Sequence, residues 1–478
     1  MNYEIRIPSL NLDFTVPPSK SVVHRELIIG FLEAVKASGG RVASGVPVLR
    51  QAQQPQKNDP HKIQSIITPD PTDNDDIRAT RACLKALYEA GQSDATEVYM
   101  PCNESGSTLR FMISVGAAYL NYVGLAQKKK LVFLPKGRLI ERPLDQLIIC
   151  LAARGVTVVV DKQKNEITVE GVLTPGCFVI QGNVSSQYIS GIAMALILLP
   201  GYSVELQGEL ESRGYFDLTL QVMKEHGVDI GEGGPSRAFK DTIPGQVFEE
   251  NLESSRSERL PEALEGPFQI ALRQAQGPQG QNSPEGDWSS AAFLLCLGAL
   301  VPDGQIILHG LNKNSLQKDK IIISILEQLD FAFSWSGSSV QLTARPDISK
   351  TRDLELNLDA ADYPDIVPYI AIVAAVYTKS TCIKNIERLH FKECDRVEAT
   401  INALKAAKVS AYEKDGTLYI TGGHKATGEL SISTYGDHRM AMTACLVAAW
   451  TGLPVLIDNK ECVNKSFPGL LELLECAI

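Results

Sequence analysis

Six segments of this chain share one arrangement, in which a polar turn rich in Ser, Gly or Asp runs directly into an apolar stretch of helix length. The polar turns begin at Pro17, Glu104, Asn183, Gly286, Asp362 and Tyr435. They recur at intervals of about 70 to 100 residues, the self-similarity expected of a chain built from repeated supersecondary units. Such a chain is constrained to fold as stacked copies of one unit.

A second recurring element lies between the apolar stretches, an amphipathic stretch with a charged start. Residues 77–90, 142–155 and 215–227 are examples, and β-rich text follows several of them, as in Val156–Val160. Each unit therefore reads as strand, buried helix, strand, amphipathic helix and further strands. We expect an α/β fold of six units, arranged as two lobes of three.

The apolar stretches are apolar nearly all round, so each helix is expected in the core, covered by sheet and by neighbouring helices. Their polar first turns must then reach the surface. Any one such turn is an ordinary helix cap. Several helix N-termini aimed at one cleft, however, would form an anion-binding site, because each carries unpaired N–H groups and roughly half a positive charge.

Basic residues occupy equivalent places in these units, and any single one of them would be interpreted as a solvated surface charge. They are Lys20, Arg25, Arg110, Arg142, Lys392, Arg396, Arg439 and Lys465. Together, in a chain with 46 Lys and Arg against 56 Asp and Glu, they predict a site for a multiply anionic ligand. The net charge of −10 does not oppose this, because charges beyond a Debye length of about 8 Å are screened at physiological salt.

Charge and hydropathy disfavour several other classes of protein. A net charge of −10 argues against a nucleic-acid or anionic-membrane surface. The best candidate for a membrane span, Ile189–Leu199, stops at Pro200 and is too short to cross a bilayer. The first residues show no basic-then-apolar signal pattern. We expect a cytoplasmic protein with no nucleic-acid or membrane partner.

Cysteine spacing and low-complexity text add no candidate site. The ten cysteines are scattered without a C-x-x-C pair, so neither a disulfide framework nor a zinc site is expected. Residues 37–60 and 231–284 break the repeat and share a near-identical octamer, LRQAQQPQ from Leu49 and LRQAQGPQ from Leu272. Their composition predicts inserted surface loops.

Two carboxylates stand beside cations and are candidates for proton transfer. Asp365 lies at the start of the fifth apolar stretch, and Glu393 lies in the sequence KECDR. Each could equally serve as a helix cap or an ion-pair partner. His438, just before Arg439, is a candidate acid or hydrogen-bond donor, although a lone histidine is more often structural.

Ten short motifs follow one another along the chain: SKSVVHR (Ser19–Arg25), SGSTLR (Ser105–Arg110), ERP (Glu141–Pro143), NVSSQ (Asn183–Gln187), SRGYFD (Ser212–Asp217), EGDWSSA (Glu285–Ala291), YPD (Tyr363–Asp365), KECDR (Lys392–Arg396), GDHRMAM (Gly436–Met442) and NKSFP (Asn464–Pro468). In this order they resemble the EPSP synthase family, the 3-phosphoshikimate 1-carboxyvinyltransferases. The resemblance runs from about residue 5 to the C-terminus, apart from the two insertions.

The resemblance implies a two-domain enolpyruvyl transferase fold, each domain holding three βαβαββ units with parallel buried helices. The N-terminal domain would span residues 19–283, insertions included. The C-terminal domain would join residues 1–18 to residues 284–478, so that the chain crosses between the domains twice. The domains would close over the cleft where the helix N-termini converge. A monomer is expected.

The reaction implied is transfer of the enolpyruvyl group from phosphoenolpyruvate to the 5-hydroxyl of shikimate 3-phosphate, with release of phosphate, in chorismate and aromatic amino acid biosynthesis. The scheme requires no cofactor and no metal. Carried over motif by motif, the residues for shikimate 3-phosphate would be Lys20, Ser21, Arg25, Ser185, Ser186, Gln187, Ser212, Tyr215, Asp365 and Lys392. Those for phosphoenolpyruvate would be Lys20, Gly106, Arg142, Gln187, Arg396, Arg439 and Lys465.

The resemblance also implies roles for individual side chains. Asp365 would be the base on the hydroxyl and Glu393 the proton donor to C3, with His438 a further candidate. Lys20 and two other cations, Arg142 and Lys465, would stabilise phosphate charge. The chain departs from the usual pattern in several places. Glu104 replaces a neutral residue, Ser107 replaces Thr and Arg388 stands where a polar neutral residue is common. The stretch between Leu87 and Met100 is also too short for the usual strand pair.

Two other functions remain open. UDP-N-acetylglucosamine enolpyruvyl transferase has the same fold and donor, and would be expected to carry a loop cysteine and nucleotide contacts. The NVSSQ and SRGYFD motifs favour the shikimate acceptor instead. A non-catalytic anion-binding protein on the same scaffold is the second alternative, and the presence of Lys20, Asp365, Glu393 and Lys465 argues against it.

Overall fold

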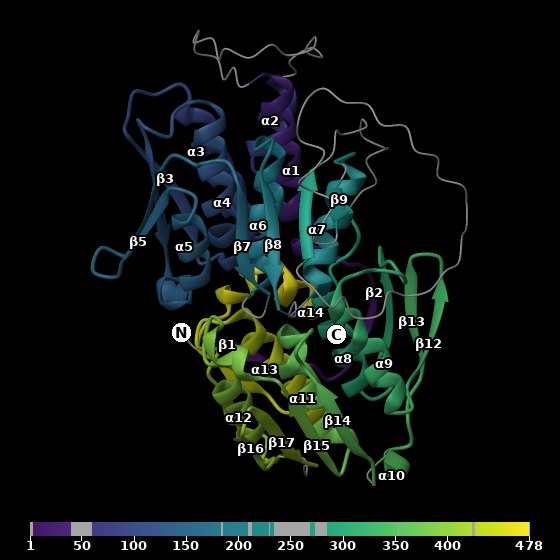
Figure 1. Cartoon of the computed structure of the whole chain (residues 1–478). Helices are drawn as coiled ribbons and strands as arrows, with labels where there is room; N and C mark the ends of the chain where they lie inside the picture. Colours follow the sequence, from purple (N-terminus) through teal and green to yellow (C-terminus); the bar gives the residue numbers. More distant parts are fainter. Residues whose placement is uncertain are drawn as a thin grey trace.

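Two separate hydrophobic cores organise the chain in this computed structural model, which describes residues 3–39, 60–182, 185–208, 213–228, 230–233, 268–272, 284–351, 353–422 and 426–477. The core of the upper lobe is built from residues between Val22 and Val228. The core of the lower lobe combines residues Ile5 to Val16 with residues Trp288 to Ala477. Figure 1 shows the two lobes one above the other, the upper in purple to teal and the lower mainly in green to yellow.

Each lobe is built around apolar helices, as the sequence repeat predicts. The helices are α1 (Lys20–Ala37), α4 (Gly106–Tyr122) and α6 (Ser186–Ala195) in the upper lobe, and α8 (Trp288–Leu300), α11 (Val367–Tyr377) and α13 (His438–Thr451) in the lower lobe. In α8 every residue except Ser289 is buried, because the helix has no polar face to turn toward water. Within the lobes, α4 packs on α6 and α11 packs on α13.

The remaining α-helices lie closer to the surface. They are α2 (Pro60–Ile67), α3 (Asp75–Ala90), α5 (Asp145–Ala152), α7 (Arg213–Glu225), α9 (Ile322–Gln328), α10 (Ile348–Thr351), α12 (Arg396–Ala406) and α14 (Leu470–Ala477). The sides of α3 and α7 that face the core are apolar and the opposite sides are charged, as the amphipathic stretches predict.

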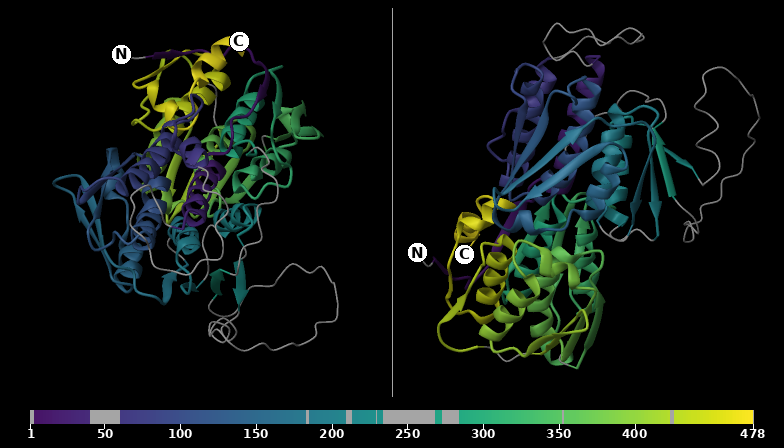
Figure 2. Two further views of the ribbon diagram at one scale, coloured as in Figure 1. Left: turned by 90° about the horizontal axis from the view of Figure 1, so that it is seen from above. Right: turned by 60° about the vertical axis from the view of Figure 1, so that its left-hand side comes forward.

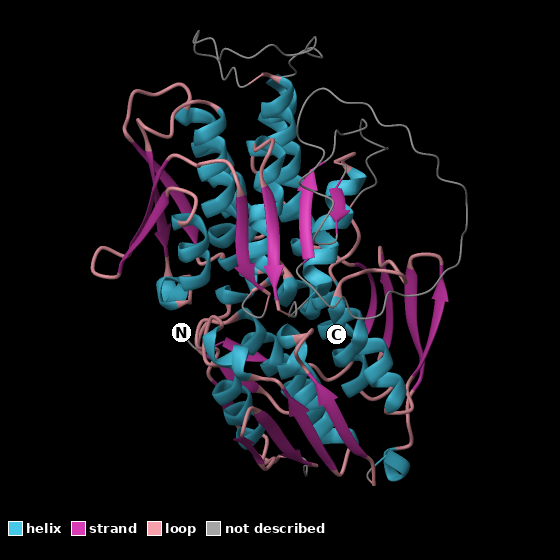
Figure 3. Ribbon diagram, viewed as in Figure 1, coloured by secondary structure: helices cyan, strands magenta, loops and turns pink. Residues whose placement is uncertain are grey.

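The strands in the described part of the chain form five sheets around these helices (Figure 3). The upper lobe has sheets of order β3-β4-β6-β5 and β7-β8-β10-β9, with strands β3 (Glu97–Asn103), β4 (Lys130–Pro135), β5 (Val156–Asp161), β6 (Glu166–Gly171), β7 (Cys177–Gln181), β8 (Ser203–Gln207), β9 (Ile230–Gly233) and β10 (Phe268–Leu272).

The lower lobe has sheets of order β12-β13-β11-β2, β14-β15-β17-β16 and β1-β19-β18. Their strands are β1 (Tyr3–Ile5), β2 (Asn11–Thr15), β11 (Gln305–His309), β12 (Ala332–Ser336), β13 (Ser339–Ala344), β14 (Glu355–Asp359), β15 (Ser380–Lys384), β16 (Ala411–Lys414), β17 (Thr417–Thr421), β18 (Leu430–Ile432) and β19 (Val455–Ile457).

One parallel strand pair recurs in every sheet, and an apolar helix connects its strands in four of the five. The pairs β3/β4, β7/β8, β14/β15 and β18/β19 flank α4, α6, α11 and α13 in this way. In the fifth sheet β2 pairs in parallel with β11, and α8 directly precedes β11. Among the described residues the first unit departs from this scheme, because only helices lie between Lys20 and Ala90.

The connections between the lobes run side by side. The amide of Ser19 donates to the carbonyl of Glu285 at 2.7 Å, and the amide of Asp287 donates to the carbonyl of Pro17 at 2.8 Å. The two crossings therefore form a short antiparallel bridge between the lobes. The chain ends also lie close together, as the ribbon views in Figure 2 show. There β1 pairs with β19, and the Tyr3 hydroxyl donates to Glu475 at 2.5 Å.

Three further features considered in the sequence are the cysteines, possible membrane-spanning helices and the two inserted stretches. All ten cysteines are free thiols. No helix in the described part of the chain has the length and hydropathy needed to cross a membrane. The stretches 37–60 and 231–284, predicted to be inserted loops, lie largely outside the described residues.

Candidate active site

A single cleft collects the first turns of all six apolar helices. It is lined by Lys20 and Ser21 of α1, Gly106 and Ser107 of α4, Ser186 and Gln187 of α6, Asp287 and Ser289 at α8, Pro364 and Asp365 of the 3-10 turn η4 (Pro364–Ile366) before α11, and His438 and Arg439 of α13. The convergence expected from the repeat therefore exists, and both lobes contribute to it.

Side-chain caps fix several of these helix starts. Ser105 and Ser185 accept hydrogen bonds from amides in the first turns of α4 and α6, both at 3.3 Å. Asp287 and Asp437 accept from the amides of Ser290 and Arg439, both at 2.8 Å. Each cap satisfies one of the four free amides of its helix start, and the helix dipole makes this end electropositive.

The cleft carries an excess of positive charge. Its described lining includes eight Lys or Arg residues against four Asp or Glu residues. Seven of the eight cations expected from the sequence are among them, and the eighth, Lys465, lines an adjoining cavity that shares Arg142 and Glu393 with the cleft. Such a surface attracts ligands with several negative charges, although the whole chain is acidic.

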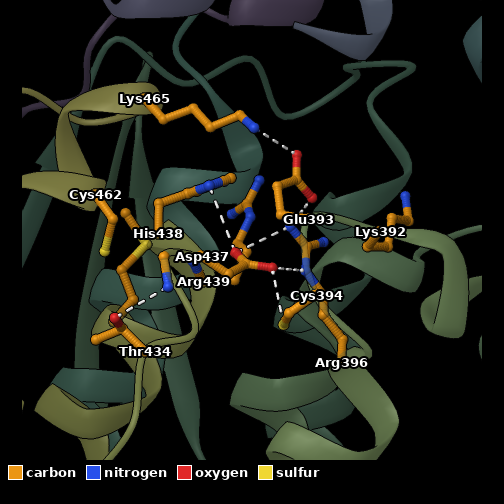
Figure 4. Close-up of polar contacts among 12 residues, drawn as sticks. Lys392, Glu393, Cys394, Arg396, Thr434, Asp437, His438, Arg439, Cys462 and Lys465 are labelled. Carbon is orange, nitrogen blue, oxygen red and sulfur yellow. Dashed lines mark hydrogen bonds and ion pairs between the residues drawn. The ribbon is translucent and has the colours of Figure 1, made fainter. Parts of the chain in front are cut away.

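Arg396 is the centre of the charge network on the lower-lobe side (Figure 4). Its guanidinium lies 2.7 Å from a carboxylate oxygen of each of Asp365, Glu393 and Asp437. The side chain is only 1% exposed, so burial is compensated by charge-assisted hydrogen bonds. This network holds both proposed proton-transfer carboxylates against one fixed cation.

Asp365 is ionised in this arrangement. Burial raises the pKa of its carboxyl, but Lys392 at 3.1 Å, Arg396 and Arg439 together hold that pKa well below the usual range. A carboxylate of this kind accepts hydrogen bonds readily, and its basicity depends on whether its cation partners remain in contact with it.

Glu393 is surrounded by cations from both lobes. Arg142 lies 3.3 Å from it, Lys465 lies 3.1 Å from it, and Arg396 completes the set. Burial raises the pKa of Glu393, but Lys465, Arg142 and Arg396 lower it well below the usual range. Glu393 is therefore a carboxylate, and must gain a proton before it can donate one.

Two ion pairs cross between the lobes at this point. Arg142, which follows the 3-10 turn η1 (Gly137–Glu141) of the upper lobe, reaches Glu393 of the lower lobe. Lys465, at the end of η6 (Glu461–Lys465) of the lower lobe, reaches the carboxylate of Glu104 at 3.4 Å in the upper lobe. Residues expected to bind phosphoenolpyruvate thus also join the two lobes.

The upper-lobe side is organised by hydrogen bonds. Gln187 bridges Arg110 at 2.8 Å and Ser107 at 2.9 Å, so the starts of α4 and α6 are tied together. Arg25 is buried, and its guanidinium donates to the Thr219 hydroxyl at 2.7 Å and to the Tyr215 carbonyl at 2.9 Å. These contacts fix Arg25, Arg110 and Gln187 on the upper-lobe side of the cleft.

Gly106 makes room for a cation. A Cβ atom at this position would lie 2.8 Å from Arg142 Nη1 and 3.3 Å from Arg110 Nη1. A glycine here therefore allows two guanidinium groups to approach the first turn of α4, where its free amides lie.

His438 is buried and neutral. Burial and the neighbouring Arg439 lower its pKa well below the usual range. Its Nδ1 lies 3.5 Å from Asp437 Oδ1, and neither ring nitrogen has a hydrogen-bond partner among the described residues. Arg439 Nη1 donates to the Tyr369 hydroxyl at 3.1 Å, which orients it at the cleft.

Most residues expected from the sequence therefore share this one cleft, including Ser185, Tyr215 and Lys392. Ser212 lies outside the described residues. Two important carboxylates were not expected: Asp76, which pairs with Lys20 at 2.9 Å, and Asp437, which pairs with Arg396. Asp437 had a signal in the sequence, since it directly precedes an apolar helix as a capping residue. Arg388 also lines the cleft.

Comparison with known proteins identifies the family. The family model described as EPSP synthase (3-phosphoshikimate 1-carboxyvinyltransferase) matches residues 6–249 and 269–474. The chain belongs to the EPSP synthase family. This membership confirms the resemblance and the class of reaction expected from the ten motifs.

Curated relatives and solved structures agree with that family. A 3-phosphoshikimate 1-carboxyvinyltransferase of Clostridium novyi (strain NT) is 30% identical over 486 residues, covering 97% of this chain and 94% of the relative. One of Clostridioides difficile (strain 630) is 28% identical over 469 residues, covering 96% and 93%.

The fold is shared with solved enolpyruvyl transferases. An EPSP synthase of Acinetobacter baumannii aligns with a TM-score of 0.62 at 19% identity, covering 100% of this chain and 98% of that one. The enolpyruvyl transferase NikO of Streptomyces tendae aligns with a TM-score of 0.57 at 14% identity, covering 100% and 97%. The expected two-domain enolpyruvyl transferase fold is thereby confirmed.

Proposed function

We propose that this chain transfers the enolpyruvyl group of phosphoenolpyruvate to the 5-hydroxyl of shikimate 3-phosphate and releases inorganic phosphate. The observation that supports this most strongly is the joining of six helix N-termini and eight cations in one cleft that also holds Asp365 and Glu393. Both substrates carry a phosphate and a carboxylate, so together they match the positive charge of the cleft.

Shikimate 3-phosphate would bind between the lobes. Arg25, Ser185, Ser186 and Tyr215 of the upper lobe line one side of the cleft. Asp365 and Lys392 of the lower lobe line the other, and Ser21 and Gln187 also line the cleft. Ser212, which lies outside the described residues, is a further proposed contact. The arrangement supports a hydroxyl held against the Asp365 carboxylate, within reach of proton transfer.

Phosphoenolpyruvate would bind beside Glu393. Lys20, Arg142 and Lys465 would hold its phosphate, and Arg396 and Arg439 would hold its carboxylate, with Gly106 and Gln187 at the edge. The ion pairs that these cations make with Asp76 and Glu393 are then exchanged for contacts with the ligand.

Chemistry proceeds through a tetrahedral adduct. The 5-hydroxyl loses its proton to Asp365 and its oxygen bonds to C2 of phosphoenolpyruvate, while C3 gains a proton from Glu393 and becomes a methyl group. C3 then returns that proton to the Glu393 carboxylate as the C2–O bond to phosphate breaks, which restores the double bond and releases phosphate. The hydroxyl proton held by Asp365 leaves with the inorganic phosphate or passes to solvent, so both carboxylates are regenerated. Lys20, Arg142 and Lys465 stabilise the phosphate charge in both steps.

Protonation of Glu393 is tied to ligand binding in this scheme. The cations that lower its pKa are the ones that phosphoenolpyruvate would occupy. Adding the negative charges of the ligand beside Glu393 raises that pKa, so the proton needed at C3 becomes available when the donor is bound. His438 is buried and neutral, and its role as an acid or hydrogen-bond donor in the cleft stays a prediction.

The two lobes correspond, in this proposal, to domains formed by residues 19–283 and by residues 1–18 with 284–478. Two separate cores and the paired crossings at Ser19 and Asp287 support this division. Closure of the domains would exclude water from the adduct. The monomeric state and the cytoplasmic location stay predictions.

An acceptor comparison tests the function. Phosphate release is measured by a coupled assay with phosphoenolpyruvate and either shikimate 3-phosphate or UDP-N-acetylglucosamine. Turnover is expected only with shikimate 3-phosphate, because the cleft places Arg25 and Lys392 where a phosphorylated acceptor would bind. Turnover only with the nucleotide sugar would assign the chain to the other transferase, and binding without turnover would make it an anion-binding protein.

A further inference from the structure

Glu104 places a carboxylate on a cation of the donor site. It lies between β3 and the cap Ser105 of α4, and its side chain is half-exposed. Lys465 of the other lobe donates to the Glu104 carbonyl at 3.2 Å and lies 3.4 Å from its carboxylate. Gly137 leaves room for this carboxylate, because a Cβ atom at position 137 would lie only 3.1 Å from Glu104 Oε1.

Lys465 is held by carboxylates on more than one side. It is 8% exposed, and its ammonium also lies 3.1 Å from Glu393. Burial lowers the pKa of Lys465, but Glu393, Asp76 and Glu104 raise it above the usual value. Lys465 is therefore protonated, and its positive charge is paired with carboxylates of the protein itself.

Glu104 stands among both cations and carboxylates. It lines the adjoining cavity together with Lys136, Arg138, Arg142 and Lys465, and the same lining includes Glu393, Asp395 and Glu398. Its negative charge lowers the positive potential at the end of the cleft that would hold the donor phosphate. The residues proposed for shikimate 3-phosphate, such as Arg25 and Tyr215, belong to the main cleft and do not line this cavity.

We propose that Glu104 is a specificity-determining residue that competes with the phosphate of phosphoenolpyruvate, and with inorganic phosphate, for Lys465. The inference rests on the proposed function and deepens it. The carboxylate acts as an internal anion that a donor must displace, so it weakens binding of the donor and of the phosphate product without affecting the acceptor. Release of phosphate after turnover is helped in the same way, because Glu104 can return to Lys465.

The test compares Glu104→Gln with the unaltered enzyme. We expect the KM for phosphoenolpyruvate to fall by about fivefold, the effect of removing one solvent-screened charge contact, with the KM for shikimate 3-phosphate unchanged. The dissociation constant of inorganic phosphate, measured by isothermal titration calorimetry in the presence of shikimate 3-phosphate, should fall by a similar factor. Both differences should shrink as salt is added.

Two further variants separate charge from shape. Glu104→Asp keeps the carboxylate and should retain most of the unaltered KM, whereas Glu104→Ala should behave like Glu104→Gln. Glu97→Gln is the matched control, because Glu97 lies on the same strand β3 and forms an exposed ion pair with Lys130 away from the cleft. It should change neither constant.

An unchanged or higher KM for phosphoenolpyruvate in Glu104→Gln, in an enzyme that turns over, would overturn the inference. A higher KM would assign Glu104 to lobe closure or donor binding instead. Absence of turnover in the unaltered chain would count against the proposed function, and the phosphate titration would then decide on Glu104 alone. Equal phosphate affinity in Glu104→Gln and the unaltered chain would reject the competition.

Discussion

Three carboxylates share the Arg396 guanidinium, but they differ in their other contacts. Asp437 is fully buried and accepts from the amide of Arg439 as well as from Arg396, so it is committed to structure. Asp365 and Glu393 line the cleft, and each contacts further cations that a ligand can draw away. The same guanidinium thus fixes one carboxylate and leaves two available.

Replacement of either available carboxylate should abolish most activity. We expect Asp365→Ala and Glu393→Gln each to lower kcat by at least about 10²-fold, because each removes a group that moves a proton in the proposed mechanism. Steady-state kinetics with both substrates gives kcat, and circular dichroism checks the fold. Asp359→Asn is a control at the exposed end of β14. Near-normal turnover in either variant would remove that residue from the mechanism.

Asp319, in the 3-10 turn η3 (Lys318–Ile321), makes stability depend on pH. Burial and the nearby Asp365 raise the pKa of its carboxyl from 3.8 to about 7. Because the folded-state pKa lies above the unfolded one, its contribution to stability is complete below about pH 4 and is lost as the pH rises through about 7.

The variant Asp319→Asn removes this titration. Relative to the unaltered chain, the variant should gain thermal stability as the pH rises from 5 to 8. Thermal unfolding across this range, followed by circular dichroism, measures the difference in Tm. A difference that stays constant over these pH values would mean that Asp319 is not titrating as its burial implies.

At the scale of elements, the site depends on close packing of α4 against α6. A Cβ on Gly191 of α6 would lie 3.0 Å from the carbonyl oxygen of Arg110 and 3.1 Å from the Cα of Phe111. Both are backbone atoms, so a larger residue can be accommodated only if the helices separate. The starts of these helices carry Arg110 and Gln187, which meet in the cleft.

We therefore expect Gly191→Ala to destabilise the fold by about 1 to 3 kcal/mol and to raise the KM for both substrates. The matched control is Gly30→Ala in α1, where a Cβ would make only an ordinary contact of 3.4 Å with Ile66. That change should be neutral or slightly stabilising, because alanine favours a helix. Urea unfolding compares the two. Equal stabilities would show that the two helices can adjust.

The helix starts were predictable from the sequence, but the long-range side-chain pairs that their residues form were not. Ser105, Asp287 and Asp437 cap helices where the polar turns indicated, because capping acts within three residues. The pair of Lys20 with Asp76 joins residues 56 positions apart, and no local pattern encodes it. The repeat also predicted strands in the first unit, where the described residues form helices only.

The cleft itself was predictable only as a convergence of like elements. Because one unit is repeated, its polar turns were expected to point in the same direction. The ten motifs, through the family they resemble, indicated which substrates would bind where those turns meet. Arg396 can contact three carboxylates only because η4, η5 (Glu387–Phe391) and the start of α13 lie close to one another. The spacing of these elements is set by packing in the core. Such distances follow from tertiary structure alone.

At the scale of the whole molecule, the lobes are joined by paired crossings and by two ion pairs at the cleft. A ligand that contacts both lobes should stabilise them together. Shikimate 3-phosphate alone, at about 100 times its Kd, should add about 2.7 kcal/mol to the free energy of unfolding. Differential scanning calorimetry should then show the whole transition moving upward.

Unphosphorylated shikimate at the same concentration is the control, and should move the transition much less, because it lacks the charge that Arg25 and its neighbours would bind. A thermogram in which one lobe unfolds at an unchanged temperature while the other shifts would place the ligand within a single lobe. That outcome would contradict a site formed between them.

The most direct measurement is phosphorus NMR of the chain incubated with phosphoenolpyruvate and shikimate 3-phosphate. We expect the phosphoenolpyruvate signal to decline only when both substrates are present, with one inorganic phosphate formed for each shikimate 3-phosphate converted. Phosphate formed equally fast without the acceptor, or no phosphate at all from a folded chain, would contradict enolpyruvyl transfer in this cleft.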